Sequence, residues 1–303
     1  MIDKILAFGD SFMLGDELAI HEYSDRYQYL RDIAPDVILN SGGAVDLIKT
    51  SEQSIDIIRT RFSRMGPKDY IEKCHNHVLA GQLAAHLNVP YHNYAGQGYS
   101  NSAILSELIL HKDEITSNTL VLVGLTSATR TTRYDNYNNN PQIYSVVSNL
   151  KSMSVKDDPG HQQYLMLDLT YGNDFLTKVM EVRNHICTVK HILANNQYLI
   201  IDPTSLFLDR NVRDIIRSHK NFRTTIEMID DDDNVYPKRN DLISDLEQFF
   251  IDNIYHETLY EQAMLIRDSG KEYLAPFSHY NRDVHTAYMN NILIPELQQR
   301  GYL

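Results

Sequence analysis

The stretch Lys4-Ile5-Leu6-Ala7-Phe8-Gly9-Asp10-Ser11-Phe12 decides the fold of this chain. An apolar run of strand length stops at a glycine, an acid and a serine, and helix-favouring residues follow. This order predicts a buried first strand, a tight turn and a helix. Ligands bind outside the carboxyl ends of strands in open α/β sheets, so Ser11 is expected at the mouth of a site. There it can act as a nucleophile whose own N–H helps to hold an oxyanion, or it can simply cap the helix.

Length and composition describe a globular chain. Its 303 residues are 43% hydrophobic and 22% charged, enough to build one large α/β domain over 1–303. The formal net charge of −12 argues against a nucleic acid or an anionic membrane as partner. No apolar run reaches the roughly 20 residues that span a bilayer. The first residues lack the features of a signal peptide, so we expect synthesis in the cytoplasm.

The cysteine and histidine content suggests no metal or other cofactor. Cys74 and Cys187 fit a reduced compartment better than a disulfide scaffold. Cys74-His75-Asn76-His77 has the residue types of a metal cluster. A structural zinc site needs four ligands in spaced pairs, however, and no second pair stands out.

Three further apolar segments complete the expected sheet. Strands are predicted at 91–95, 119–126 and 197–203, and helical spacing of apolar residues is found at 71–87, after 101 and at 174–195. Alternation of buried strands with helices predicts a three-layer, flavodoxin-like, doubly wound parallel sheet. Three segments break this rhythm and are expected to be insertions: 21–70, 131–165 and 205–275. The second is rich in Asn and Tyr and is expected to be a surface loop, whose aromatic side chains could also line a carbohydrate groove or a protein contact.

Polar turns are expected to meet at one edge of this sheet. The turn at 93–101 has two glycines, whose N–H groups can approach a ligand closely. The strand at 119–126 ends in small hydroxyl residues, and two histidines, His279 and His285, stand at the entrance of a C-terminal helix. A strand-end serine, a glycine turn, a small polar turn and a late histidine together compose an acyl-transfer site.

These same residues resemble the SGNH/GDSL hydrolases. Phe8-Gly9-Asp10-Ser11-Phe12 is similar to the first block of that family, which implies that Ser11 is the nucleophile. The segment 93–101 is similar to the second block, which implies that Gly98 supplies an oxyanion N–H. Gly124-Leu125-Thr126-Ser127 stands where the family has Gly-x-Asn-Asp, so that Thr126 replaces the oxyanion Asn; with Arg130 it resembles a branch common in bacteriophage proteins. His279-Tyr280-Asn281 with His285 resembles the last block, which implies that His279 is the base.

The chain departs from the family at the triad acid. The family places an Asp two or three residues before the catalytic His, and here those positions hold Phe277 and Pro276. Two arrangements can restore a partner. His279 can use a backbone carbonyl or a distant acid, for which the candidates are Asp268, Glu272 and Asp202. Alternatively His285 is the base, with Asp283 two residues before it; otherwise His285 packs at the helix N-terminus.

The resemblance implies a serine esterase that removes small acyl groups, such as acetyl, from a carbohydrate ester. The alternative is a catalytically silent protein of the same fold, a phage virion component that docks to protein partners through its insertions. The missing acid and the replacement by Thr126 favour this alternative. A nucleotide-binding protein of flavodoxin-like shape fits less well, because no Gly-rich phosphate loop follows the first strand.

Overall fold

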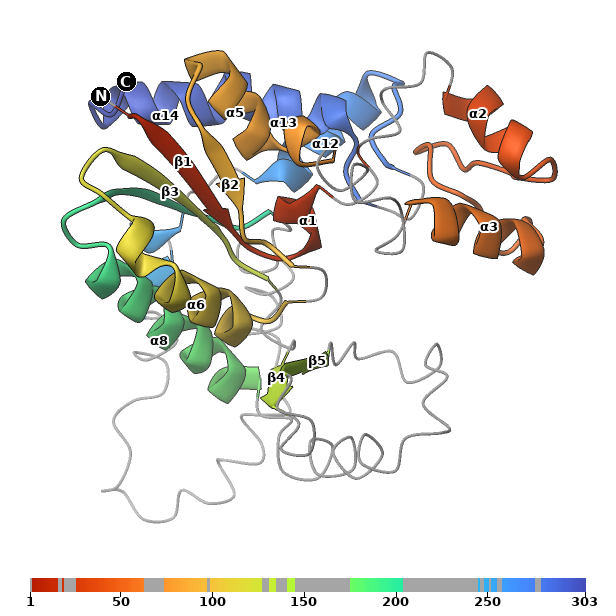
Figure 1. Cartoon of the computed structure of the whole chain (residues 1–303). Coiled ribbons are helices and arrows are strands. Elements are labelled where there is room, and N and C mark those ends of the chain that lie inside the picture. Colours follow the sequence, from red (N-terminus) through yellow and green to blue (C-terminus); the bar gives the residue numbers. More distant parts are fainter. Residues whose placement is uncertain are drawn as a thin grey trace.

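A four-stranded parallel sheet lies at the centre of the structure (Figure 1). The computed structural model describes residues 2–15, 18, 26–62, 74–96, 99–126, 131–134, 141–144, 175–203, 245, 248–250, 252–254, 258–275 and 279–303. The sheet contains β1 (Lys4–Phe8), β2 (Tyr91–Asn93), β3 (Thr119–Gly124) and β6 (Gln197–Ile201) in the order β2-β1-β3-β6. All three strand pairings are parallel, with Ala7 opposite Asn93 on one side and Leu122 on the other.

Helices cover both faces of this sheet (Figure 1). One layer comprises α5 (Leu79–Leu87), α12 (Leu259–Asp268), α13 (Arg282–Tyr288), a π-helical segment (Met289–Leu293) and α14 (Ile294–Gln299). The other comprises α6 (Asn101–Leu110) and α8 (Phe175–Ile192). Successive strand residues point to opposite faces, so Ile5 and Ala7 pack in the first core and Leu6 and Phe8 in the second. Burial on both faces explains why these strands read as continuous apolar runs. The predicted α/β, doubly wound parallel sheet is therefore confirmed.

Side chains cap the N-termini of α6, α12 and α13. Ser100 caps α6 by accepting from the N–H of Ala103, and Asn281 caps α13 by accepting from two backbone N–H groups. A reciprocal capping box of Thr258 and Glu261 begins α12. Such caps satisfy N–H groups that have no partner within the helix, and they define where each helix starts.

The three expected insertions contain regular structure among their described residues. In 21–70, α2 (Arg26–Ile33) and α3 (Glu52–Phe62) lie beside the sheet layers and share a small separate core (Figure 1). In 131–165, β4 (Thr131–Tyr134) and β5 (Pro141–Tyr144) form an antiparallel pair where we expected only a surface loop. These four-residue strands lack the apolar alternation by which a strand is recognised in a sequence.

The third expected insertion, 205–275, includes α12, whose Leu259 and Ala263 are buried in the main core. The single-domain organisation and the exact limits of all three insertions stay predictions. No helix among the described residues is long and apolar enough to cross a membrane.

Candidate functional site

Ser11 lies directly after the carboxyl end of β1, as the first residue of the short helix α1 (Ser11–Leu14). Asp10 caps this helix, since its Oδ1 accepts from the N–H of Phe12 at 3.0 Å. The turn is tightly packed: a Cβ on Gly9 would lie 2.4 Å from Cγ of Met13 and 3.3 Å from the carbonyl oxygen of Gly124. Only a residue without a side chain fits there. Ser11 itself is buried. In the order β2-β1-β3-β6, the chain passes from β1 to one side of the sheet and then to the other, so β1 and β3 flank the topological switch point. Ligands bind at this point in such sheets.

Buried hydrogen bonds join the ends of β1 and β3 to the start of α6. The hydroxyl of Thr126 donates to Oδ2 of Asp10 at 2.7 Å. The side-chain amide of Asn101 makes two hydrogen bonds to the backbone of Thr126. Its Oδ1 accepts from the Thr126 N–H at 3.0 Å, and its Nδ2 donates to the Thr126 carbonyl oxygen at 2.9 Å. All three residues are buried. A hydroxyl has one proton to donate, so Thr126 would have to leave Asp10 to serve an oxyanion. Its oxyanion role stays a prediction.

The turn after β2 runs alongside the Ser11 turn. The side-chain amide of Asn93 donates to the carbonyl oxygen of Met13 at 2.9 Å, and the N–H of Gly96 donates to the carbonyl oxygen of Gly9 at 3.0 Å. These bonds bring the second sequence block beside the first, as the acyl-transfer constellation requires. Gly98 lies outside the described residues, and its role as an oxyanion donor stays a prediction.

His279 lies beside the residue that follows Ser11. Its ring meets the ring of Phe12 edge-on, with 5.1 Å between centroids and 64° between the planes. The backbone holds it there, because its carbonyl accepts from the N–H of Ala275 at 2.7 Å and Tyr280 forms an antiparallel bridge with Leu274. The tertiary structure thus places His279, from the C-terminal part of the chain, in contact with Phe12, from the N-terminal part. A hydrogen bond between Ser11 and His279 stays a prediction.

The three distant acids differ in their surroundings. Asp268 and Glu272 are exposed, whereas Asp202 is fully buried directly after β6. Burial, followed by the charges of Tyr260 and Asp202, raises the pKa of Tyr280, which places the Asp202 carboxylate in the electrostatic environment of the residue next to His279. Of these three acids, Asp202 is therefore the one that lies at the carboxyl edge of the sheet, as Ser11 does, and is shielded from water.

His285 and Asp283 have other surroundings. The imidazole of His285 is buried on α13, where its Nδ1 accepts from the backbone N–H of Leu79 at 3.4 Å. An Nδ1 that accepts leaves the proton of a neutral ring on Nε2, so that neither nitrogen is ready to take a proton from a serine. Asp283 is exposed, with its backbone N–H bound to the Asn281 cap. This geometry supports packing at the helix N-terminus as the role of His285.

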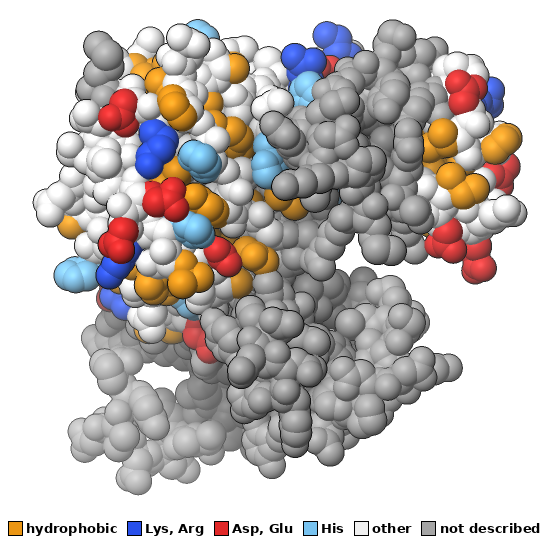
Figure 2. Space-filling view, viewed as in Figure 1, with side chains coloured by type: hydrophobic (Ala, Val, Ile, Leu, Met, Phe, Trp, Pro, Cys, Tyr) orange, Lys and Arg blue, Asp and Glu red, His pale blue; other side chains and the backbone are white. Residues whose placement is uncertain are grey.

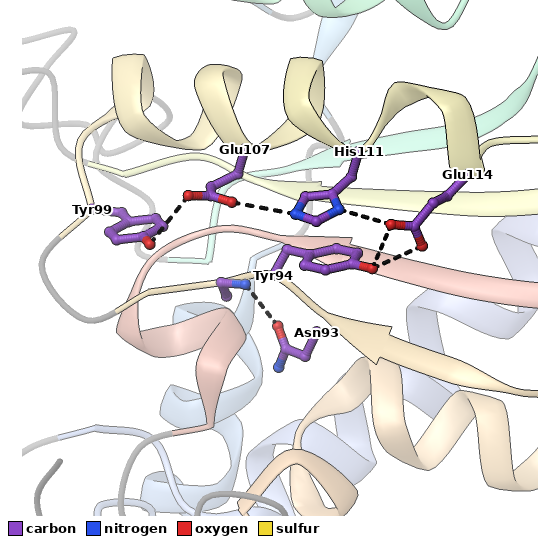
Figure 3. Close-up of polar contacts among 7 residues, drawn as sticks. Asn93, Tyr94, Tyr99, Glu107, His111 and Glu114 are labelled. Atoms are coloured by element: carbon purple, nitrogen blue, oxygen red, sulfur yellow. Dashed lines mark hydrogen bonds and ion pairs between the residues drawn. The ribbon is translucent and has the colours of Figure 1, made fainter. Parts of the chain in front are cut away.

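Sequence reasoning missed the buried link between Asp10 and Thr126 and the cluster of Tyr94, Glu107, His111 and Glu114 shown in Figure 3. The first pair is 116 residues apart and left no signal in the sequence. Glu107 and Glu114 lie four residues before and three residues after His111, a spacing that can be recognised as helical. Tyr94 is distant from these residues in the sequence, so its contact with them could not be recognised.

No group of three or more His, Cys, Asp or Glu side chains in the described part of the chain is placed to hold a metal ion.

Comparison with known proteins found likeness only among solved structures. No family model and no curated protein matches the chain. One similar structure is a carbohydrate esterase whose active site displays divergent catalytic and non-catalytic binding functions, at 12% identity, with a TM-score of 0.38 over 98% of this chain. A family two carbohydrate esterase from Clostridium thermocellum, in complex with cellohexaose, gives 10% identity and 0.36 over 99%. An acetyl xylan esterase from the rumen bacterium Butyrivibrio proteoclasticus gives 8% and 0.40 over 99%. The chain spans 65% of the length of each of them.

Proposed function

We propose that this protein is a serine esterase of the SGNH type, with Ser11 as nucleophile and His279 as base. The observation that carries the proposal is the contact of the His279 ring with Phe12, which places a histidine from the C-terminal part of the chain beside the nucleophile turn. A serine after β1 and a histidine packed on the next residue are the two groups that acyl transfer requires.

The proposed reaction has two steps. The Ser11 hydroxyl oxygen attacks the ester carbonyl while its proton passes to His279, and the imidazolium then protonates the departing alcohol. Water attacks the resulting acyl-serine, with His279 taking one proton from it and returning that proton to Ser11. In both steps the backbone N–H groups of Ser11 and Gly98 hold the negative oxygen, and Thr126 can join them only by releasing Asp10.

Asp202 is the acid best placed to support His279 in this scheme. It is buried at the carboxyl edge of the sheet and acts on the neighbouring Tyr280, whereas Asp283 is exposed on α13. A buried carboxylate would orient the imidazole and stabilise its charged form. The assignment of this role to Asp202 rather than to Asp283 is part of the proposal.

The substrate class, a small acyl ester such as an acetylated carbohydrate, follows the resemblance of the sequence blocks. A silent protein of the same fold is the second candidate, because the Thr126 hydroxyl is bound to Asp10 rather than directed to a substrate. The phage-type branch, virion association and protein partners rest on the sequence resemblance alone.

Hydrolysis of p-nitrophenyl acetate and of an acetylated xylo-oligosaccharide separates the two candidates. Ser11→Ala and His279→Ala should each lower kcat by about a thousandfold or more, because the nucleophile and base act as a unit. Ser102→Ala is the matched control: its hydroxyl lies 3.2 Å from Nε2 of His185 on the surface between α6 and α8. A fluorophosphonate probe should label Ser11 in the parent protein and leave the Ser11→Ala variant unlabelled.

Either of two results contradicts the esterase. One is a parent protein without activity on both substrates, and the other is a Ser11→Ala variant that matches the parent. Circular dichroism of each variant shows whether it is folded, so that loss of activity can be assigned to chemistry.

A further inference from the structure

Two carboxylates and an imidazole form a bridge beside the turn that follows β2 (Figure 3). His111 contacts Oε1 of Glu114 through Nδ1 at 2.8 Å and Oε2 of Glu107 through Nε2 at 3.6 Å. We refer to Glu107, His111 and Glu114 as the Glu–His–Glu bridge. The hydroxyl of Tyr94 donates to Glu114 at 2.8 Å, and that of Tyr99 donates to Glu107 at 3.4 Å. Each end of the bridge therefore holds one tyrosine of the segment 94–99.

Ring stacking adds to these hydrogen bonds. The Tyr94 ring lies 3.7 Å from the His111 ring and 5.3 Å from the Phe8 ring, with both pairs stacked. Burial, followed by the contact with Glu114, raises the pKa of Tyr94 to about 12, so that it remains a hydrogen-bond donor at neutral pH. The Tyr99 ring packs on Gly96, where a Cβ would lie 2.2 Å from it. Both tyrosines are thus fixed by packing as well as by the bridge.

The segment held in this way also contacts the Ser11 turn. Its Gly96 N–H donates to the carbonyl of Gly9, and its Tyr94 N–H donates to the carbonyl of Ala7 at 2.8 Å. Displacement of either tyrosine would therefore move backbone that is bonded to the end of β1. Figure 2 shows histidine, acidic and apolar side chains gathered on the face formed by α5, β2 and α6.

We propose that His111 is a positioning residue that holds Tyr94, and with it the backbone bonded to the end of β1, and Tyr99, which is next in sequence to the predicted oxyanion donor Gly98. Its effect on catalysis rests on the proposed esterase function, whereas its effect on the backbone does not.

One imidazole serves two acceptors in this bridge. An imidazolium donates from both nitrogens and satisfies Glu107 and Glu114 together, whereas a neutral ring has one N–H and can serve only one of them. The other groups facing the bridge are the Lys4 ammonium, which donates to the backbone carbonyl of Glu114 at 2.6 Å, and His92, whose ring stacks on Tyr94 at 6.3 Å. Hydrogen bonds from His111 and then Tyr94 lower the pKa of Glu114.

His111→Phe tests the bridge, because phenylalanine keeps the stack on Tyr94 and removes both contacts to the acids. His191→Phe, on the exposed side of α8, is the matched control for loss of a histidine. Amide hydrogen exchange of the segment 94–101 is measured for both variants and the parent at pH 6. Glu107→Gln is the second variant, since its side-chain oxygen can still accept while its charge is lost.

At pH 6 we expect exchange in 94–101 to be about two- to fivefold faster in His111→Phe than in the parent, in line with the loss of exposed ion pairs, and unchanged in His191→Phe. With acetyl ester as substrate, kcat should fall by about three- to tenfold with KM unchanged, because an oxyanion contact forms only in the transition state. Glu107→Gln should lie between the parent and His111→Phe in both measurements.

Equal exchange in the parent and His111→Phe at pH 6 overturns the positioning role. A parent protein without esterase activity overturns the proposed function, while faster exchange in His111→Phe still supports the bridge. The two proposals can therefore fail separately.

Discussion

Replacement of Thr126 by valine removes a buried hydroxyl that donates to Asp10 from the segment after β3, while keeping the shape of the side chain. Donor and acceptor are buried, at 1% and 0% exposure, and their atoms lie 2.7 Å apart. A buried hydrogen bond to a charged group contributes about 1.5–3 kcal/mol, and Asp10 would lose one of its donors while keeping the N–H of Phe12. We expect Thr126→Val to lower the free energy of unfolding by about 2–3 kcal/mol.

Urea unfolding followed by far-UV circular dichroism measures this effect, because the chain has no Trp for fluorescence. Thr126→Ser keeps the hydroxyl and should recover most of the loss. Thr286→Val is the comparison variant: this half-buried hydroxyl lies 2.7 Å from Oε1 of Gln82 and 2.9 Å from the carbonyl oxygen of Arg282, both neutral, and its loss should cost only about 1 kcal/mol. If Thr126→Val lies within 0.5 kcal/mol of Thr286→Val, the buried charge does not strengthen this bond and the reasoning is refuted.

Three further changes test individual contacts at the Ser11 turn, beside α2 and α3, and at the start of α12. Gly9→Ala should destabilise the protein by about 1–3 kcal/mol in thermal melts, since its Cβ would lie 2.4 Å from Cγ and 2.5 Å from Cβ of Met13. Most of the loss should persist when Met13→Ala is added, because alanine keeps that Cβ, and full recovery contradicts this account. The pKa of Asp36 is lowered to about 2 by hydrogen bonds, first from Ser51, so its contribution to stability is present above its ordinary value of 3.8 and disappears as the pH falls towards 2. The urea midpoint of Asp36→Ala should accordingly be lower than that of the parent at pH 6 and about equal to it at pH 2. A difference in midpoint that stays the same at both pH values contradicts the proposed link between the protonation of Asp36 and stability. Thr258→Ala removes the cap of α12 and should cost about 1 kcal/mol by the same measurement, whereas Thr258→Ser should be neutral.

The sequence was sufficient for features that depend on local backbone geometry. The run Lys4–Phe8 and the polar residues after it predict a strand and a tight turn, because both depend on the period of the side chains and on residues without a Cβ. The parallel order of strands followed from their alternation with helices, and Ser11 was placed at the correct edge for the same reason. The same approach overlooked β4 and β5, whose four-residue strands are too short to show a period.

Only the tertiary structure decided which polar groups meet. Asp10 and Thr126 are separated by 116 residues, and His285 and Leu79 by 206, so no local pattern could pair them. Two histidines at the start of one helix looked alike in the sequence, yet His279 packs on Phe12 while His285 is bound to the start of α5. The physical reason is that strand and helix period depend on neighbouring residues, whereas contacts at a sheet edge depend on how separate turns pack together in three dimensions.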